Sequence, residues 1–116
     1  IIKLKEGGRM TCSKKIYTLD EIKSISNPVF KQYPSIKEAY LFGSYARGEA
    51  TEKSDLDFMV VLNDYKIESL KDELRVEEDL RVAFQKNVDT LNDEDAMQIM
   101  RKSIERDGTK VYEQTN

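Results

Sequence analysis

The stretch "LFGSYARGEATEKSDLDF", residues 41–58, places two aspartates two positions apart in a segment that otherwise reads as a buried β-strand. Residues two apart on a strand point to the same face, so Asp55 and Asp57 project together while Leu56 and Phe58 face the opposite way. Two carboxylates about 4 Å apart repel by about 4 kcal/mol at an effective dielectric constant of about 20. A divalent cation between them turns this repulsion into attraction. The pair therefore predicts a metal site of oxygen ligands, the kind that Mg²⁺ and Mn²⁺ prefer.

The first half of the same stretch predicts a place for phosphate groups. Gly43 and Ser44 directly follow a predicted strand and precede residues 45–47, which can form one helical turn. Glycine lets an anion approach the backbone, and the free N–H groups at a helix start favour negative charge. A serine hydroxyl adds a donor, and Arg47 or Lys53 can supply positive charge. Taken singly these features are ordinary turns and solvated charges, but their combination predicts a site for a metal-bound nucleoside triphosphate.

The composition favours one small domain. The chain has 116 residues, 39% hydrophobic and 35% charged, which is enough for a single modest core. Its longest apolar runs, such as residues 58–62, are too short to cross a bilayer, so we expect a cytoplasmic protein without membrane contact. The formal net charge of -3 argues against an extended nucleic-acid surface. Because histidine is missing and Cys12 is the only cysteine, a Cys/His zinc site and an internal disulfide are excluded.

The first residues, "IIKLKEGGRM", indicate that the natural protein begins later. A purine-rich run containing GGAGG can encode residues 5–8, and this run resembles a bacterial ribosome-binding site just upstream of Met10. We hypothesise that translation starts at Met10 and that residues 1–9 are not native; an ordinary flexible tail is the alternative. The intact mass of the protein made from its own gene distinguishes the two. We assign residues 1–17 to a tail and residues 18–116 to the single domain.

The first helix is predicted from its capping signal. Thr18 and Glu21 have the spacing of a capping box, so the helix begins there. Pro28 should kink or split this helix before Tyr33-Pro34 ends it, because proline lacks a backbone donor. Strands are predicted over residues 36–42, 55–62, 87–91 and 110–112, the last as an edge strand.

Two further helices are predicted from apolar residues at helical spacing. One covers residues 67–86, and the other runs from a cap at Asn92 or Asp93 to a stop at Gly108. The residues expected to face the core are Ile67, Leu70, Leu74, Leu80 and Phe84 in the first of these, and Ala96, Ile99, Met100 and Ile104 in the second.

The Gly-Ser turn, the Arg-Gly step and the Ser-Asp-x-Asp strand together resemble the signature of the minimal nucleotidyltransferases, a family of the DNA polymerase beta superfamily. The residues that match the signature are Gly43, Ser44, Arg47, Gly48, Ser54, Asp55 and Asp57. The resemblance extends from Thr18 to Glu113. It implies an α/β (α+β) fold in which helices flank a small mixed β-sheet, the DNA polymerase beta-like nucleotidyltransferase fold. The family carries a third carboxylate on a later strand, for which Asp89 in "KNVDTL" is the candidate.

The resemblance also implies a metal-dependent transfer of AMP from ATP to a hydroxyl. The implied catalytic and metal-binding residues are Asp55, Asp57 and Asp89, and the implied nucleotide-binding residues are Gly43, Ser44, Arg47 and Ser54. Asp55 and Asp57 would hold Mg²⁺ against the triphosphate, while Gly43 and Ser44 grip the β- and γ-phosphates. Asp89 would complete a second metal site and help to deprotonate the acceptor. Two Mg²⁺ ions would then support attack at the α-phosphorus with pyrophosphate leaving.

This motif does not identify the molecule that accepts the nucleotide. A separate acceptor-binding domain does not fit in this length of chain, so we expect the acceptor on another chain or across a homo-oligomer. Many short members of the family resemble antitoxins paired with a HEPN-domain toxin, and some add AMP to a tyrosine of that toxin; we favour this function. Transfer to a small-molecule hydroxyl and a non-catalytic antitoxin that acts by binding are the alternatives. The three aspartates favour catalysis, because binding alone does not need a repulsive pair.

Overall fold

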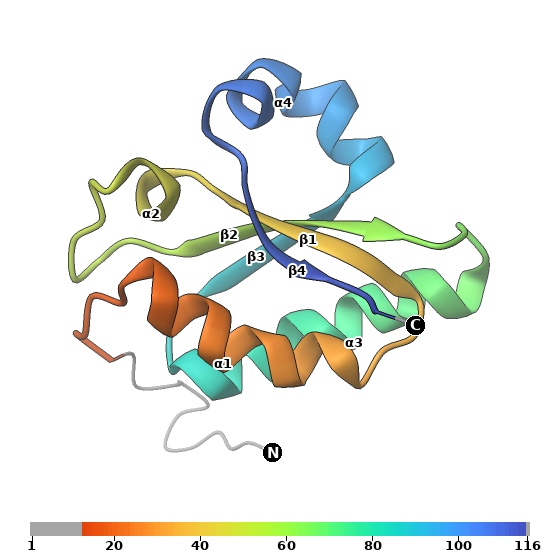
Figure 1. Cartoon of the computed structure of the whole chain (residues 1–116), viewed down its shortest axis with the longest axis horizontal. Helices are drawn as coiled ribbons and strands as arrows, with labels where there is room; N and C mark the ends of the chain where they lie inside the picture. The colour runs from red at the N-terminus through yellow and green to blue at the C-terminus, as the bar shows by residue number, and fades with distance from the viewer. Residues whose placement is uncertain (1–12, 116) are drawn as a thin grey trace, which may run out of the picture.

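The described part of the chain forms a four-stranded sheet with helices on both faces (Figure 1). The computed structural model describes residues 13–115, so the predictions for residues 1–9, Met10 and Cys12 lie outside the described residues. In chain order the elements are α1 (Leu19–Lys31), β1 (Ile36–Phe42), α2 (Ser44–Arg47), β2 (Leu56–Leu62), α3 (Ile67–Phe84), β3 (Val88–Asn92), α4 (Asp93–Asp107) and β4 (Thr109–Glu113).

The strand order is β3-β2-β1-β4, and the sheet is mixed. β1 pairs antiparallel with β2 and β4, whereas β2 and β3 are parallel. A parallel pair needs a long crossover connection, and α3 provides it. Figure 1 shows α1 and α3 together on one face of the sheet and α4 on the other. The predicted fold class, a small mixed sheet flanked by helices, is confirmed.

The strand predictions are close to the observed bounds. The strand over residues 36–42 is found as predicted, and the predicted edge strand at 110–112 is the centre of β4. β2 begins at Leu56, one residue after the predicted start, so Asp55 lies just before the strand. β3 is shifted by one residue toward the C-terminus relative to the prediction.

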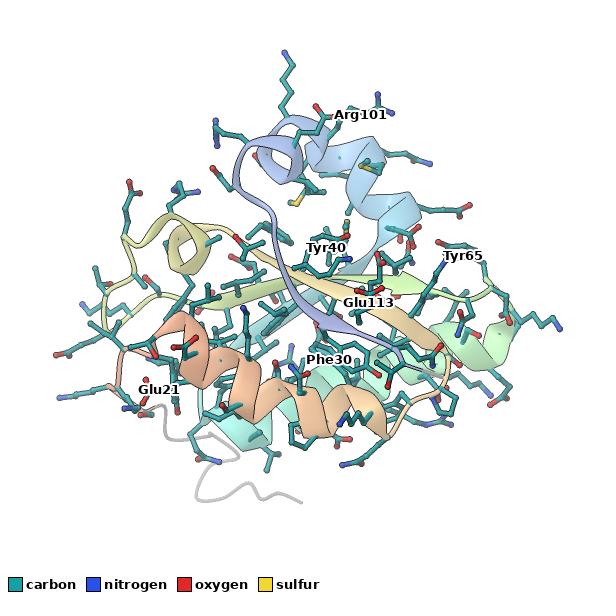
Figure 2. All side chains as sticks on the ribbon, viewed as in Figure 1. Glu21, Phe30, Tyr40, Tyr65, Arg101 and Glu113 are labelled. Carbon is teal, nitrogen blue, oxygen red and sulfur yellow. The ribbon has the colours of Figure 1, made fainter. Side chains whose placement is uncertain are left out.

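α1 begins with the predicted capping box. The Glu21 backbone N–H donates to Thr18 Oγ1 over 3.1 Å, and the Thr18 N–H donates to Glu21 Oε1 over 2.9 Å. The helix is not split at Pro28 but continues to Lys31. Pro28 removes only one backbone donor, and Val29 and Phe30 hold the following residues in the core. In Figure 2, Phe30 lies between α1 and the sheet.

α3 buries part of the predicted stripe. Leu80 and Phe84 are fully buried and Leu70 packs against the core, as predicted. Ile67 and Leu74 are each 67% exposed, contrary to the prediction. Near the start of the helix the polar Ser69 is buried instead, and its hydroxyl donates to Asp64 Oδ1 over 2.7 Å. The helix ends at Phe84, two residues before the predicted end, because Gln85 adopts a left-handed conformation with φ of 56°.

α4 packs on the second face of the sheet and is interrupted within its length. Asn92 caps it through a 2.9 Å hydrogen bond from the Asp95 N–H, as predicted. Ala96 and Ile104 are buried, but Ile99 is 69% exposed, contrary to the prediction. Met100 has φ of -141° and ψ of 39°, which breaks the helical phase. Residues before and after this break therefore do not share one continuous face.

Residues 13–17 lie against the C-terminal end of α3. Tyr17 donates its hydroxyl to the Phe84 carbonyl over 2.7 Å, and the two rings meet edge to face at 5.1 Å. The Ser13 N–H donates to the Gln85 carbonyl over 2.6 Å. Among the described residues, we find no helix of the length and apolar character needed to cross a membrane.

Candidate active site

The strand register brings two of the predicted aspartates side by side. Asp57 on β2 is paired with Asp89 on β3, and Phe42, the last residue of β1, is paired with Asp57 on the other side. Because β1 runs antiparallel to β2, Gly43 emerges at the end of the sheet where β2 and β3 begin. The Gly-Ser turn and the carboxylates therefore meet at one end of the sheet.

Asp57 is the electrostatic centre of this arrangement. Its side chain is partly buried, on the face opposite the fully buried Leu56 and Phe58. Burial, and then the neighbouring charges of Asp89 and Asp55, raise the pKa of Asp57 to about 6, while Arg47 acts in the opposite direction. A partly buried carboxylate that is repelled by two neighbouring negative charges is a strong candidate for binding a cation.

Gly43 approaches Asp57 more closely than any other residue type could. Its φ of 79° and ψ of -158° lie in a region that essentially only glycine adopts. A Cβ atom at this position would lie 2.6 Å from Asp57 Oδ2, which is too close for any real contact. The glycine of the predicted phosphate turn is thus required both by the backbone conformation and by its carboxylate neighbour.

Ser44 begins the short helix α2. The Arg47 N–H donates to the Gly43 carbonyl over 3.1 Å, and Gly48 closes the helix in a left-handed conformation. The N–H groups at the start of a helix have no intrahelical acceptor and favour an anion. Ser44 is partly exposed at the start of this helix, next to the glycine that contacts Asp57. The chemistry of this turn fits a phosphate group.

Arg47 and Ser54 make contacts within the protein. Arg47 Nε lies 3.0 Å from Glu49 Oε1 and its Nη1 lies 3.3 Å from Asp107 Oδ2, and both hydrogen bonds raise the pKa of Arg47. Ser54 Oγ accepts from the Thr51 N–H over 2.8 Å. Ser54 thus shapes the turn that leads into Asp55, and Arg47 ties α2 to the end of α4.

The carboxylates fit a hard cation in their chemistry but are not gathered around a single point. Asp55, Asp57 and Asp89 offer only oxygen ligands, which suit Mg²⁺ or Mn²⁺. Across residues 13–115, however, no three Asp, Glu or Cys side chains converge closely enough to hold an ion between them. Asp55 and Asp89 are exposed. Rotation of these two exposed side chains toward Asp57 would complete the ligand set.

Comparison with known proteins agrees with this geometry. A model of the family described as "Polymerase beta, Nucleotidyltransferase" matches residues 23–116. The chain belongs to this family. A "putative protein adenylyltransferase" of Methanocaldococcus jannaschii is 37% identical over 94 residues, which cover 78% of this nucleotidyltransferase and 94% of the relative.

Solved structures support the fold. A chain of a toxin-antitoxin complex with AMP-PNP matches the nucleotidyltransferase with a TM-score of 0.63 at 22% identity, covering 81% of this chain and 73% of that one. A chain from the structure of a tri-AMPylated HEPN toxin of Shewanella oneidensis in complex with an MNT antitoxin matches with a TM-score of 0.54 at 17% identity, covering 79% and 73%. At these identities the likeness establishes the shared fold.

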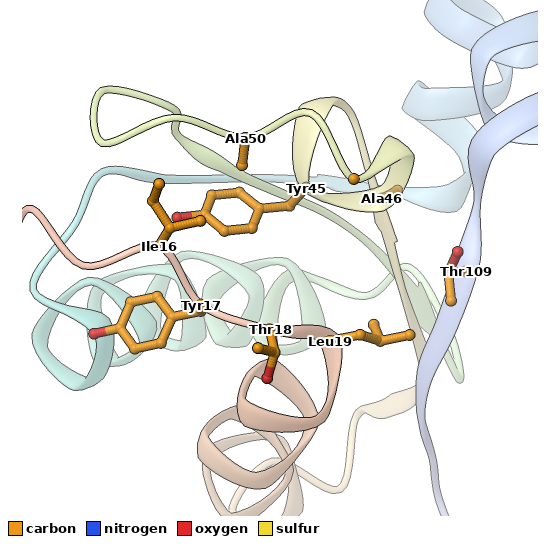
Figure 3. A pocket seen from close by; sticks show the side chains of 9 residues that line it. Ile16, Tyr17, Thr18, Leu19, Tyr45, Ala46, Ala50 and Thr109 are labelled. Carbon is orange, nitrogen blue, oxygen red and sulfur yellow. The ribbon is translucent and has the colours of Figure 1, made fainter.

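One cavity of the nucleotidyltransferase lies apart from the carboxylates. It has a volume of about 330 Å³, and Figure 3 shows it between residues 16–19, α2 and Thr109 at the start of β4. Tyr45 lines this cavity, and its buried hydroxyl has no hydrogen-bond partner among the described residues. Because no charged side chain lines this cavity, it does not suit a triphosphate.

Two residues of the site region were missed at the level of sequence. Asp107 is far from the motif in the chain, and no local pattern connects it to Arg47. Lys86 is only 2% exposed. No local pattern reveals this burial, because Lys86 lies in the short connection between α3 and β3.

Proposed function

We propose that this nucleotidyltransferase transfers AMP from ATP to a tyrosine hydroxyl of a HEPN-domain toxin and so acts as the antitoxin. The observation that carries the proposal is the position of Asp57, partly buried beside Asp89 and in contact distance of Gly43. The same end of the sheet thus offers a cation site and a phosphate turn. ATP and Mg²⁺ are both available in the cytoplasm, where we place the reaction.

In this proposal the two halves of the motif bind different parts of the substrate. Gly43 and Ser44 receive the β- and γ-phosphates at the start of α2, and Asp55, Asp57 and Asp89 hold Mg²⁺. When bound, Mg²⁺ neutralises the triphosphate and stabilises charge on the entering and leaving oxygens. Arg47 lies close enough to lower the pKa of Asp57, so its charge also acts at this end of the sheet.

The transfer is an in-line displacement at the α-phosphorus. The acceptor oxygen forms a bond to that phosphorus, the bond to the bridging oxygen breaks, and pyrophosphate leaves with the electron pair. Asp89 accepts the hydroxyl proton. Asp89 is exposed and lies on β3, an edge strand of the sheet, so an acceptor on another chain can reach it.

A protein acceptor is supported by the relatives rather than by the site alone. The relative from Methanocaldococcus jannaschii bears the name of a protein adenylyltransferase, and two chains of similar fold come from toxin-antitoxin complexes. The short signature around Gly43 and Asp57 also resembles that of HEPN-paired antitoxins.

The proposal is tested by incubating the purified protein with Mg²⁺ and ATP labelled at the α-phosphate, with and without the product of the adjacent gene, which the proposal expects to be a HEPN protein. We expect label on the HEPN protein, on tyrosine, and no label with the Asp57→Asn variant. Label on neither protein, although the two form a complex, would favour an antitoxin that acts by binding. Label on an added small molecule instead would show a different acceptor class.

A further inference from the structure

A second cavity, of about 420 Å³, adjoins the candidate metal site and is rich in lysine. Three lysines line it, Lys14, Lys53 and Lys86, together with the carboxylates of Glu52 and Asp55. The cavity thus has an excess of one positive charge in a chain whose formal net charge is -3. We call this cavity the lysine pocket.

Lys86 gives the lysine pocket a fixed positive charge. Its side chain is 2% exposed, and its Nζ donates to the Ser13 carbonyl over 2.8 Å and to the Glu52 carbonyl over 3.0 Å. An ammonium group has three N–H donors, so one remains for a ligand. Within residues 13–115 no carboxylate forms an ion pair with Lys14, Lys53 or Lys86. A buried charge without a counter-ion is costly, and an anionic ligand relieves that cost.

The lysine pocket lies on the acceptor side of the site rather than on the phosphate side. The strand order puts β1 and β3 on opposite sides of β2. Gly43 follows β1, whereas Asn87 directly precedes β3, which carries Asp89. None of the residues 43–48 lines the lysine pocket, but Asp55 does. An anion bound there is therefore next to the cation site and on the side of the carboxylate proposed to take the acceptor proton.

We propose that the lysine pocket binds an acidic side chain of the protein acceptor, close in sequence to the tyrosine that receives AMP. This inference rests on the proposed function and names the recognition element of that acceptor. The buried Lys86, held by its two hydrogen bonds to backbone carbonyls, supplies one donor, and the exposed Lys14 and Lys53 approach the carboxylate from the surface. The excess of one positive charge in the pocket matches a single carboxylate, and the overall negative charge of the chain disfavours a nucleic-acid backbone.

The test uses the full chain and two short synthetic peptides. One peptide has a tyrosine flanked on both sides by glutamates, and the matched peptide has glutamines in their place. Binding is followed by calorimetry and by the amide NMR signals of residues 52–55 and 86–87. We expect the acidic peptide to bind more tightly than the neutral one, by roughly fivefold or more, and to shift these signals.

Variants of the exposed Lys14 and Lys53 test whether the lysine pocket causes the preference for the acidic peptide, and they leave the buried Lys86 in place. The double variant Lys14→Ala/Lys53→Ala should lose the preference for the acidic peptide. The matched control is Lys31→Ala/Lys37→Ala, which removes the same amount of charge from the exposed surface at the far end of the sheet. This control variant should keep the preference for the acidic peptide. ATP binding is read on the single variant Lys14→Ala, whose Kd for ATP should equal that of wild type, since Lys14 lines the pocket and is not part of the phosphate site.

Equal binding of both peptides would overturn the inference, and so would acidic-peptide binding that survives Lys14→Ala/Lys53→Ala. A weaker Kd for ATP in Lys14→Ala would instead assign the lysine pocket to the nucleotide. Preferential binding of a single-stranded oligonucleotide would assign it to nucleic acid, and either result overturns the inference. The AMP-transfer assay is read separately. Failed transfer with intact, lysine-dependent peptide binding would overturn the proposed function and leave the binding site standing.

Discussion

Two adjacent residues of β2, Asp57 and Phe58, have different roles on the two faces of the sheet. Phe58 is fully buried and packs against Phe30, with ring centroids 5.7 Å apart. Asp57, its neighbour, points to the other face, where burial and then two neighbouring carboxylates raise its pKa. Phe58 gains stability from apolar burial, while Asp57 carries an electrostatic cost that a ligand can relieve. Stability and function in this nucleotidyltransferase should therefore be separable by substitutions one residue apart.

The largest expected effect is on activity, from Asp57→Asn. The amide keeps the size of the side chain but removes its charge, so cation binding is weakened and we expect AMP transfer to fall by about a thousandfold or more. The measurement is the rate of transfer at saturating ATP and Mg²⁺. An unchanged far-ultraviolet circular dichroism spectrum is the control. Transfer within tenfold of wild type would show that Asp57 is not at the reaction centre.

The largest expected effect on stability is from the neighbouring residue. Phe58→Ala should lower the free energy of unfolding by about 3 to 5 kcal/mol, because it leaves a cavity between α1, α3 and the sheet. Denaturant unfolding of the two single variants measures the contrast directly. If Asp57→Asn and Phe58→Ala destabilise the metal-free protein equally, then it is wrong that Phe58 mainly stabilises the fold while Asp57 mainly serves the site.

The glycine turn sharpens the comparison, because it offers a matched pair. Gly43→Ala places a Cβ 2.6 Å from Asp57 Oδ2 at a φ of 79°, whereas Gly48→Ala has φ of 73° and meets nothing within 4 Å. Gly48→Ala carries backbone strain of about 1 to 2 kcal/mol in the left-handed region, and Gly43→Ala carries more, because its φ and ψ are essentially restricted to glycine. Only Gly43→Ala should also displace Asp57, so under conditions in which both variants are folded its loss of AMP transfer should greatly exceed that of Gly48→Ala. Equal losses of transfer would remove the special role of Gly43.

The smallest effect is the pH dependence of metal-free stability. The pKa of Asp57 is about 6 when folded and near its ordinary value of 3.8 when unfolded, so the folded state binds the proton more tightly. The destabilising effect of its charge is thus absent below about pH 4, grows as pH rises toward 6 and is complete above that. After allowance for solvent exposure we expect Asp57→Asn to be more stable than wild type by about 1 to 2 kcal/mol at pH 7.5.

Thermal or urea unfolding of both proteins between about pH 4 and pH 8, with a chelator present, measures this difference. Added Mg²⁺ should stabilise wild type and reduce the gap, because it binds the folded wild-type site. A gap that does not change with pH would mean that the charge of Asp57 is already compensated in the folded protein.

Local patterns were enough to predict the four strands, the capping box and the meeting of the Gly-Ser turn with the first aspartates, while the family resemblance supplied the mixed sheet. They failed where long-range packing decides. Ser69 of α3 is buried, and its polarity hides this inward position. Ile99 is 69% exposed although Ala96, one turn earlier, is fully buried. Asp107 meets Arg47, and the tertiary fold alone brings these two residues together.

The parallel pairing of β2 with β3 also sets when the proposed site is complete. The turn at Gly43 and the carboxylates Asp55 and Asp57 belong to the β1–β2 hairpin, which is made early in synthesis. Asp89 joins them only after all of α3 has been made and has crossed over the sheet. A nascent chain that lacks this crossover therefore lacks the third carboxylate. If Asp89 acts as proposed, transfer from ATP waits until the fold is complete.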